Sequence, residues 1–213
     1  MSEPWTFGVE PLAQTIELAD LLRRVAGLAL AVEEAQPALD RLVADLRSAE
    51  ADLAAVAPSD PRPRVGPAAS SGQRVYLDHS RDVGAFNPAF PTYSIAVAGD
   101  RASGTVEFPL VFEGPPGLVH GGVLATFFDC VIQHHNCDLG VSGKTASLTV
   151  EYRRPTPIGV PLHFEVDRAE EDRWIVSRAR LVHADEELCA ASARAVRGER
   201  SALPEVSPRR PGS

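Results

Sequence analysis

The stretch VHGGVLATFFDCVIQHHN, residues 119–136, decides the fold of this chain. Its apolar residues recur at helical spacing over a wide face, which predicts a helix buried on most sides. One carboxylate, Asp129, lies inside this apolar pattern, and an ionised carboxylate is seldom buried without a partner or a task. Polar residues about one turn from it form a stripe that we expect to line a pocket: Thr126, Gln133 and Asn136.

The tripeptide His120-Gly121-Gly122 opens this helix and indicates half of an acyl-transfer site. Two glycines leave bare backbone N–H groups at the positive end of the helix dipole, where a substrate carbonyl oxygen that gains charge can be bound. Gly122 and Asp129 are seven residues apart, about 10 Å along a helix, so Asp129 does not readily reach a carbonyl bound at its own glycines. A second copy, packed antiparallel about a two-fold axis, brings the two together, which predicts a dimer with shared sites.

With these residues the sequence resembles the hotdog-fold thioesterases of the phenylacetate-pathway (PaaI-like) acyl-CoA group. The resemblance covers residues 93–196 and rests on GLVHGGVLATFFD at 117–129 and TASLTVEYRRPTPIG at 145–159. It implies that the N–H of Gly121 polarises the thioester carbonyl and that Asp129 is the base or the nucleophile. It also implies that Thr145 helps to place the attacking water. From the residues themselves we expect His120 to be an orienting or hydrogen-bonding residue, since the sequence places no serine or cysteine beside it.

One position departs from that family. Some members carry an Asn or Gln six residues before the histidine to contact the thioester, and here this residue is Gly114. Either Gln133 takes over that contact or catalysis is weaker. We expect the acyl group to run toward Phe127, Phe128 and Gln133, although the two phenylalanines are equally compatible with an ordinary core.

Two arginines leave the strand that follows the helix. Arg153 and Arg154 precede a Pro-Thr-Pro turn, where a guanidinium group can bind the phosphates of coenzyme A. Neighbouring strand residues point to opposite faces, so at most one of them faces the ligand, and we assign Arg154 to this role. A solvent-facing arginine paired with a nearby acid is the alternative.

Three residues of the helix raise the question of a metal. Cys130, His134 and Cys137 fall at spacings of four and three and therefore share a helix face. Structural zinc normally needs a fourth protein ligand, and no paired CxxC or HxxxH pattern supplies one. We predict packed cysteines and an interface histidine, with neither a metal nor a cofactor.

Composition limits the partners and the cellular compartment that we expect for this chain. The chain has 213 residues and a formal net charge of −8, and it lacks a basic run, which argues against nucleic acid or an anionic membrane as the main partner. Its N-terminus has no basic n-region followed by an apolar h-region, and no apolar span is long enough for a bilayer. Three cysteines, an odd number, fit reduced thiols, so we expect a cytoplasmic protein.

Along the chain the sequence predicts four regions. Residues 1–56 form a helical extension with a heptad-like seam that Pro37 interrupts, giving a hairpin or a bent helix, the first helix ending near Ala35 or Gln36. Residues 57–73 are a Pro/Gly/Ser linker, residues 74–197 the hotdog domain, and residues 198–213 a disordered tail. Strands are predicted over 93–97, 102–112, 145–153, 162–170, 174–183 and 188–197. One long helix followed by hairpin-linked strands predicts an α+β fold, an antiparallel sheet wrapped around a central helix.

The resulting functional prediction is an acyl-CoA thioesterase, acting as a homodimer or a homotetramer on an acyl- or aryl-CoA. A non-catalytic acyl-CoA-binding protein, serving as a sensor or assembly module, is the main alternative, and Gly114 favours it. Hydration of an enoyl thioester by Asp129 and His134 ranks third, because the Asn-Pro motif of hydratases with this fold is absent. A purely structural coiled coil accounts for only the first quarter of the chain.

Overall fold

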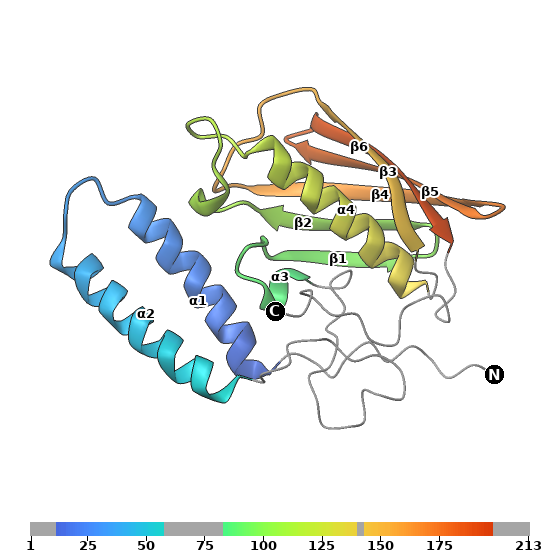
Figure 1. Ribbon diagram of the computed structural model, residues 1–213. Helices are drawn as coiled ribbons and strands as arrows, with labels where there is room; N and C mark the ends of the chain where they lie inside the picture. The colour runs from blue at the N-terminus through green and yellow to red at the C-terminus, as the bar shows by residue number, and fades with distance from the viewer. Residues whose placement is uncertain (1–11, 58–82, 140–142, 198–213) are drawn as a thin grey trace.

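The computed structural model describes residues 12–57, 83–139 and 143–197. Within these residues, antiparallel strands form one sheet in the order β1-β2-β4-β5-β6-β3, and helix α4, Gly121–Asp138, lies across it (Figure 1). The strands are β1 Tyr93–Ala98, β2 Arg101–Glu107, β3 Gly143–Tyr152, β4 Pro161–Glu171, β5 Trp174–His183 and β6 Glu186–Arg197. A sheet packed on one long helix confirms the predicted α+β hotdog architecture.

The core lies between α4 and the face of the sheet turned toward it. Side chains of a strand alternate between the two faces, and in β4 the buried apolar set is Leu162, Phe164 and Val166. Phe127 of α4 meets Phe164 edge to face, with ring centroids 5.3 Å apart. This packing fixes the rotation of α4 about its axis, so the helix residues that are not in the core face fixed neighbours.

Strand β3 occupies one edge of the sheet. It pairs with β6 along one side, from Gly143 opposite Arg197 to Tyr152 opposite Cys189, and β1 lies at the other edge. Among the described residues, no strand pairs with the second side of β3. An unpaired row of backbone N–H and C=O groups is a ready template for another strand.

The predicted end of one strand is wrong. The strand predicted over 102–112 stops at Glu107, because Pro109 lacks a backbone N–H for the sheet and is followed by a short 3-10 helix, η2, Leu110–Phe112. The helix α4 begins at Gly121, at the glycine pair that was predicted to open it. Val119 is still extended, since its N–H donates to the carbonyl of Thr156 at 2.8 Å.

The N-terminal extension is a helical hairpin. Helix α1 spans Ala13–Leu30, and α2 spans Pro37–Val56, with the chain reversing between them (Figure 1). Pro37 starts the second helix at its first turn, where its missing N–H costs nothing, whereas the first helix ends several residues before the predicted Ala35 or Gln36. No described residue of α2 is buried, so its heptad-like seam lies open in the single chain.

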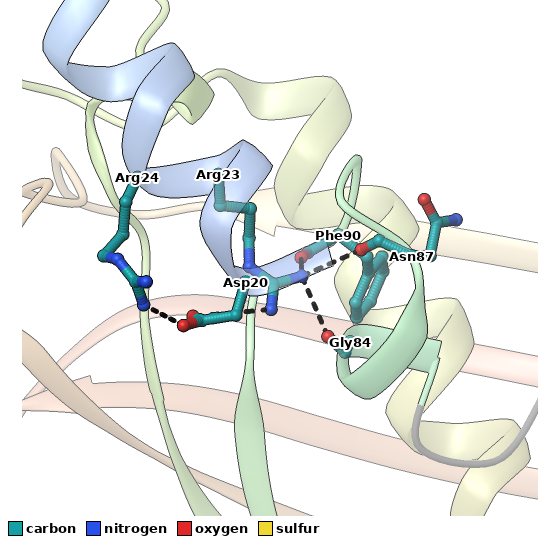
Figure 2. A network of polar contacts seen from close by, with 6 residues as sticks. All are labelled: Asp20, Arg23, Arg24, Gly84, Asn87 and Phe90. Atoms are coloured by element: carbon teal, nitrogen blue, oxygen red, sulfur yellow. Dashed lines mark hydrogen bonds and ion pairs between the residues drawn. The ribbon is translucent and has the colours of Figure 1, made fainter. Parts of the chain in front are cut away.

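Arg23 joins the extension to the domain. Its Nη1 donates to the carbonyl oxygens of Gly84 and Asn87 at 2.9 Å and of Phe90 at 3.2 Å (Figure 2). Gly84 belongs to the short helix α3, Val83–Phe86, and α1 packs on α3 and on η2. Burial lowers the pKa of Arg23, and the three carbonyls supply the polar contacts that a buried guanidinium group needs.

The predicted disordered tail and nearly all of the predicted linker lie outside the described residues. In the described part of the chain, no helix combines the length and the apolar composition required to cross a bilayer.

Candidate active site

The two glycines at the start of α4 differ in what their N–H groups contact. His120 is the N-cap, with extended backbone, and its Nδ1 accepts from the N–H of Gly122 at 3.0 Å. The N–H of Gly121 has no acceptor among the described residues. Of the pair, Gly121 therefore offers the unused donor at the positive end of the helix dipole.

Gly114 packs directly against His120. A Cβ built on Gly114 would lie 2.8 Å from Cα and 3.0 Å from Cβ of His120, which is too close for a real side chain. The position where some family members carry Asn or Gln is therefore occupied by backbone that supports the histidine. Residue 114 therefore supplies no side chain for contact with a thioester, and the contact with His120 leaves no room for one.

Asp129 ends a chain of hydrogen-bonded side chains that runs from the helix to β3. Thr145 Oγ1 donates to Asp129 Oδ1 at 2.8 Å, and Gln133 Nε2 donates to Thr145 Oγ1 at 2.8 Å. Asn136 Nδ2 extends the chain to Gln133 Oε1 at 3.5 Å, at the limit of a hydrogen bond. The predicted polar stripe thus splits: Gln133 and Asn136 support Asp129, whereas Thr126 donates to the carbonyl of Gly122 on its own helix at 2.9 Å.

This chain fixes the direction of the Thr145 hydroxyl. Because the amide nitrogen of Gln133 can only donate, Thr145 must accept from it and give its own proton to Asp129. One lone pair of Thr145 Oγ1 remains for a water molecule, whose other hydrogen can go to Asp129. The two residues can therefore orient a water between them, with its lone pairs free.

Tyr152, the last residue of β3, contacts the helix start from the other side. Its hydroxyl donates to the carbonyl oxygen of Gly121 at 2.8 Å. A cavity of about 380 Å³ opens beside it, with Pro115, Leu118, Gly121, Leu124 and Arg154 among its lining residues. Tyr152 was not predicted as a site residue, because an aromatic residue in a strand is ordinarily a packing residue.

The two arginines after Tyr152 differ in how strongly they are paired. Arg153 is bound by Glu151 at 2.9 Å and by Glu187 at 2.8 Å, and these contacts raise its pKa. Arg154 lies 3.7 Å from Glu186 and lines the cavity with its side chain 58% exposed. Arg154 is therefore the better placed of the two for an anionic ligand.

The predicted acyl contacts do not all face the cavity. Phe127 and Phe128 are fully buried in the core, with ring centroids 5.8 Å apart. Gln133 is also buried and uses its amide to hold Thr145. In the single chain, Phe127 and Phe128 are therefore core residues, the alternative that the sequence left open for them.

His134 and Asp129 face different parts of the sheet. His134 Nδ1 lies 2.7 Å from the hydroxyl of Tyr93 in β1, whereas Asp129 is bound by Thr145 in β3, at the opposite edge. His135 Nε2 contacts the carbonyl of Gly99 at 2.8 Å. This separation removes the geometric basis for a reaction that needs Asp129 and His134 together.

Cys130 follows Asp129 but is not a competing nucleophile. Burial, and secondarily the charge of Asp129, raises the pKa of its thiol to about 12, so it is protonated at neutral pH. Within the described part of the chain, no cluster of three or more His, Cys, Asp or Glu residues has the geometry to hold a metal ion.

Comparisons with known proteins bear on the fold and on the class of activity. No family model matches the chain. A crystal structure of a thioesterase superfamily protein matches with a TM-score of 0.72 and 27% sequence identity, over 89% of this chain and 98% of that one. Acyl-coenzyme A thioesterase THEM4 of Xenopus laevis is 45% identical over 47 residues, 22% of this chain and 21% of that protein. The match therefore spans about a fifth of the length of this relative.

The likeness to the crystal structure extends over the helical hairpin as well as the domain, since it covers nearly nine tenths of this chain. The matched crystal structure and the curated relative are both named as thioesterases, the class that the motifs at 117–129 and 145–159 indicate. The architecture of this chain is that of the thioesterase superfamily, the hotdog fold, and the resemblance carried by its sequence is confirmed.

Proposed function

We propose that the protein hydrolyses an acyl- or aryl-CoA thioester to the free acid and coenzyme A. The main support for this proposal is a pair of groups on α4: the N–H of Gly121, which has no acceptor among the described residues, and the carboxylate of Asp129, which accepts a hydrogen bond from Thr145. Hydrolysis of a thioester needs such a pair, a donor for the developing oxyanion and a base or nucleophile. The thioesterase likeness over most of the chain and the name of the Xenopus relative support the same substrate class.

In this mechanism the thioester oxygen accepts a hydrogen bond from the N–H of Gly121. A water oriented by Thr145 attacks the carbonyl carbon as Asp129 takes its proton. The tetrahedral intermediate then expels the coenzyme A thiolate, which takes up a proton, and the acid is left. In a second route the carboxylate of Asp129 attacks the carbonyl carbon and expels the coenzyme A thiolate, which takes up a proton, and water then hydrolyses the mixed anhydride to the free acid and the aspartate. Arg154 is proposed to bind the phosphates of coenzyme A, and His120 to hold Gly122.

The site requires two subunits in this proposal. Gly121 and Asp129 are eight residues apart on one straight helix, about 12 Å, whereas attack needs approach to roughly 3 Å. A two-fold axis that sets two copies of α4 antiparallel brings Asp129 of one chain to Gly121 of the other. The open edge of β3 supports a homodimer, because two such strands can continue one sheet across the axis. A homotetramer would then pair two of these dimers.

Binding without hydrolysis is the second candidate. Gly114, which supplies no side chain where some family members contact the thioester, is the observation that favours it. In that case the protein would act as a sensor or assembly module for acyl-CoA. The two candidates differ in one outcome, the release of free thiol.

The test is thiol release from a panel of aliphatic and aromatic acyl-CoAs. Wild type should turn over at least one of them, and Asp129→Ala should lower kcat about a hundredfold or more with its fold intact. Asp167→Ala is the matched control, since Asp167 is an exposed carboxylate paired with Arg101 on β2. If wild type binds acyl-CoA but releases no thiol, the hydrolase proposal fails and the binding proposal replaces it.

We also propose a cytoplasmic location. Its support is the state of the cysteines, since Cys130, Cys137 and Cys189 are all free thiols in a chain that has three. Cell fractionation tests it, and recovery of the protein outside the cytoplasm contradicts it.

A further inference from the structure

We propose that Tyr152 is a positioning residue for the oxyanion donor: its hydroxyl and ring hold Gly121 so that the backbone N–H points at the substrate carbonyl. This inference rests on the proposed thioesterase function and assigns to it a residue outside the predicted site.

The contacts of Gly121 carry the proposal. A glycine has no side chain of its own to hold its orientation, so neighbouring groups must do so. The hydroxyl of Tyr152 donates to the Gly121 carbonyl at 2.8 Å, and a Cβ built on Gly121 would lie 3.3 Å from Cζ of the ring. One side chain thus covers Gly121 and anchors its carbonyl, while the N–H of the same residue has no acceptor among the described residues.

The position of Tyr152 in β3 links it to the other half of the site. Thr145, near the start of this strand, binds Asp129, and Tyr152, at its end, binds Gly121. The strand therefore runs antiparallel to α4 and contacts the helix at both reactive groups. In a dimer built as proposed, each copy of β3 sets the base for one site and the oxyanion donor for the other.

The state of Tyr152 suits a fixed donor. Partial burial, and then the charge of Cys189, raises its pKa, so the phenol stays protonated at neutral and moderately alkaline pH. The side chain is 55% exposed, so most of its surface is not needed for the core. Substitution of Tyr152 is therefore expected to leave the protein folded.

The experiment compares Tyr152→Phe, which removes the hydroxyl alone, with Tyr152→Leu, which removes the ring as well. For the best acyl-CoA substrate, Tyr152→Phe should lower kcat about tenfold with KM within about twofold, because the oxyanion donor acts in the transition state. Tyr152→Leu should lower kcat further. Tyr93→Phe is the matched control, since it removes a phenol hydroxyl bonded to His134, at the opposite edge of the sheet.

A second readout is independent of turnover. The backbone amide signal of Gly121 in a ¹H–¹⁵N NMR spectrum should shift or broaden in Tyr152→Phe and remain unchanged in Tyr93→Phe. If wild type hydrolyses thioesters and Tyr152→Phe matches it in kcat, the positioning role is wrong although the function stands. If wild type hydrolyses nothing, the proposed function fails, and an unchanged Gly121 signal then overturns the positioning role separately.

Discussion

At the start of α4, His120 gives two chemically identical glycines different roles. Its Nδ1 accepts a hydrogen bond from the N–H of Gly122 and thereby caps the helix, whereas the N–H of Gly121 stays available. A donor that must bind a developing oxyanion has to be free in the resting protein, since any internal acceptor would compete with the substrate. The role that we propose for the histidine is therefore to hold the backbone of Gly122.

Thr145 provides the sharpest test of the hydrogen-bonded chain. Thr145→Val has nearly the same shape but removes the hydroxyl, so Asp129 loses a donor and Gln133 an acceptor. We expect kcat for thioester hydrolysis to fall about tenfold to a hundredfold, and Thr145→Ser to restore most of it. Steady-state kinetics on both variants checks this. Equal loss in Thr145→Ser and Thr145→Val would contradict a role for the hydroxyl.

The thiol of Cys130 predicts a pH dependence of stability. Its pKa is raised from 9 to about 12 in the folded protein, so the native state favours the neutral thiol. The contribution to stability is full below pH 9 and is lost as the pH rises toward about 12, because the unfolded chain deprotonates first. The free energy of unfolding should therefore fall more steeply between about pH 9 and about pH 12 in wild type than in Cys130→Ala. Parallel curves for the two proteins would refute it.

From the sequence, the residues proposed to react could be named, but not all of the contacts that hold them. Asp129 was predicted because a carboxylate in an apolar helix needs a partner, and that partner is Thr145. Tyr152 and the packing of Gly114 on His120 were not predicted, because both depend on where β3 and the preceding loop meet the helix start. Such contacts between segments distant in sequence leave no local pattern of spacing.

At the scale of elements, β3 is the strand that organises the site. It is an edge strand, yet it contacts α4 through Thr145 and Tyr152 and pairs with β6 over nearly its whole length. A bulge between Thr145 and Ser147 lets Thr145 and Tyr152 face the same side although they are seven residues apart. A shift of the register by one residue would turn both side chains away from the helix. Its pairing with β6 therefore supports the proposed site as well as the fold.

The junction between α1 and the domain makes a stability prediction. Arg23→Ala removes donors from three carbonyls in a buried position, and we expect a loss of about 2 kcal/mol or more in the free energy of unfolding (Figure 2). Arg24→Ala is the matched control on the same helix. Arg24 is exposed and pairs with Asp20, so its loss should cost less than about 1 kcal/mol. Chemical denaturation measures both, and equal effects would mean that Arg23 does not anchor the helix.

Element boundaries show what sequence periodicity captures. Strand β5 was predicted at its observed ends, because a buried alternation and two turns define it. The strand that should have continued to residue 112 ended early at a proline, and the first helix ended at Leu30 rather than beside Pro37. Apolar spacing locates an element, whereas its ends depend on capping contacts with other segments.

At the scale of the whole molecule, the heptad-like seam of the extension was predicted but its partner was not. Most of the large apolar side chains that the described residues leave exposed lie on α1 and α2, among them Leu28 at 70% and Val56 at 78%. A seam of this kind gives the period of a contact but no information on which surface covers it. The fold of the domain was predictable because its core lies within the chain.

In the proposed dimer, Gly121 of one subunit and Asp129 of the other form one site. Gly121→Pro removes the N–H at a first helical position where proline is tolerated, and Gly121→Ala keeps it as a control. Homodimers of Gly121→Pro and of Asp129→Ala should each be inactive in thiol release, with circular dichroism verifying their folds.

The decisive measurement is thiol release by the heterodimer of Gly121→Pro and Asp129→Ala, purified through a different tag on each chain. One of its two sites combines an intact Gly121 with an intact Asp129, so it should recover about half of the wild-type activity per dimer. A pure, folded heterodimer that remains as inactive as its parents would contradict the shared site.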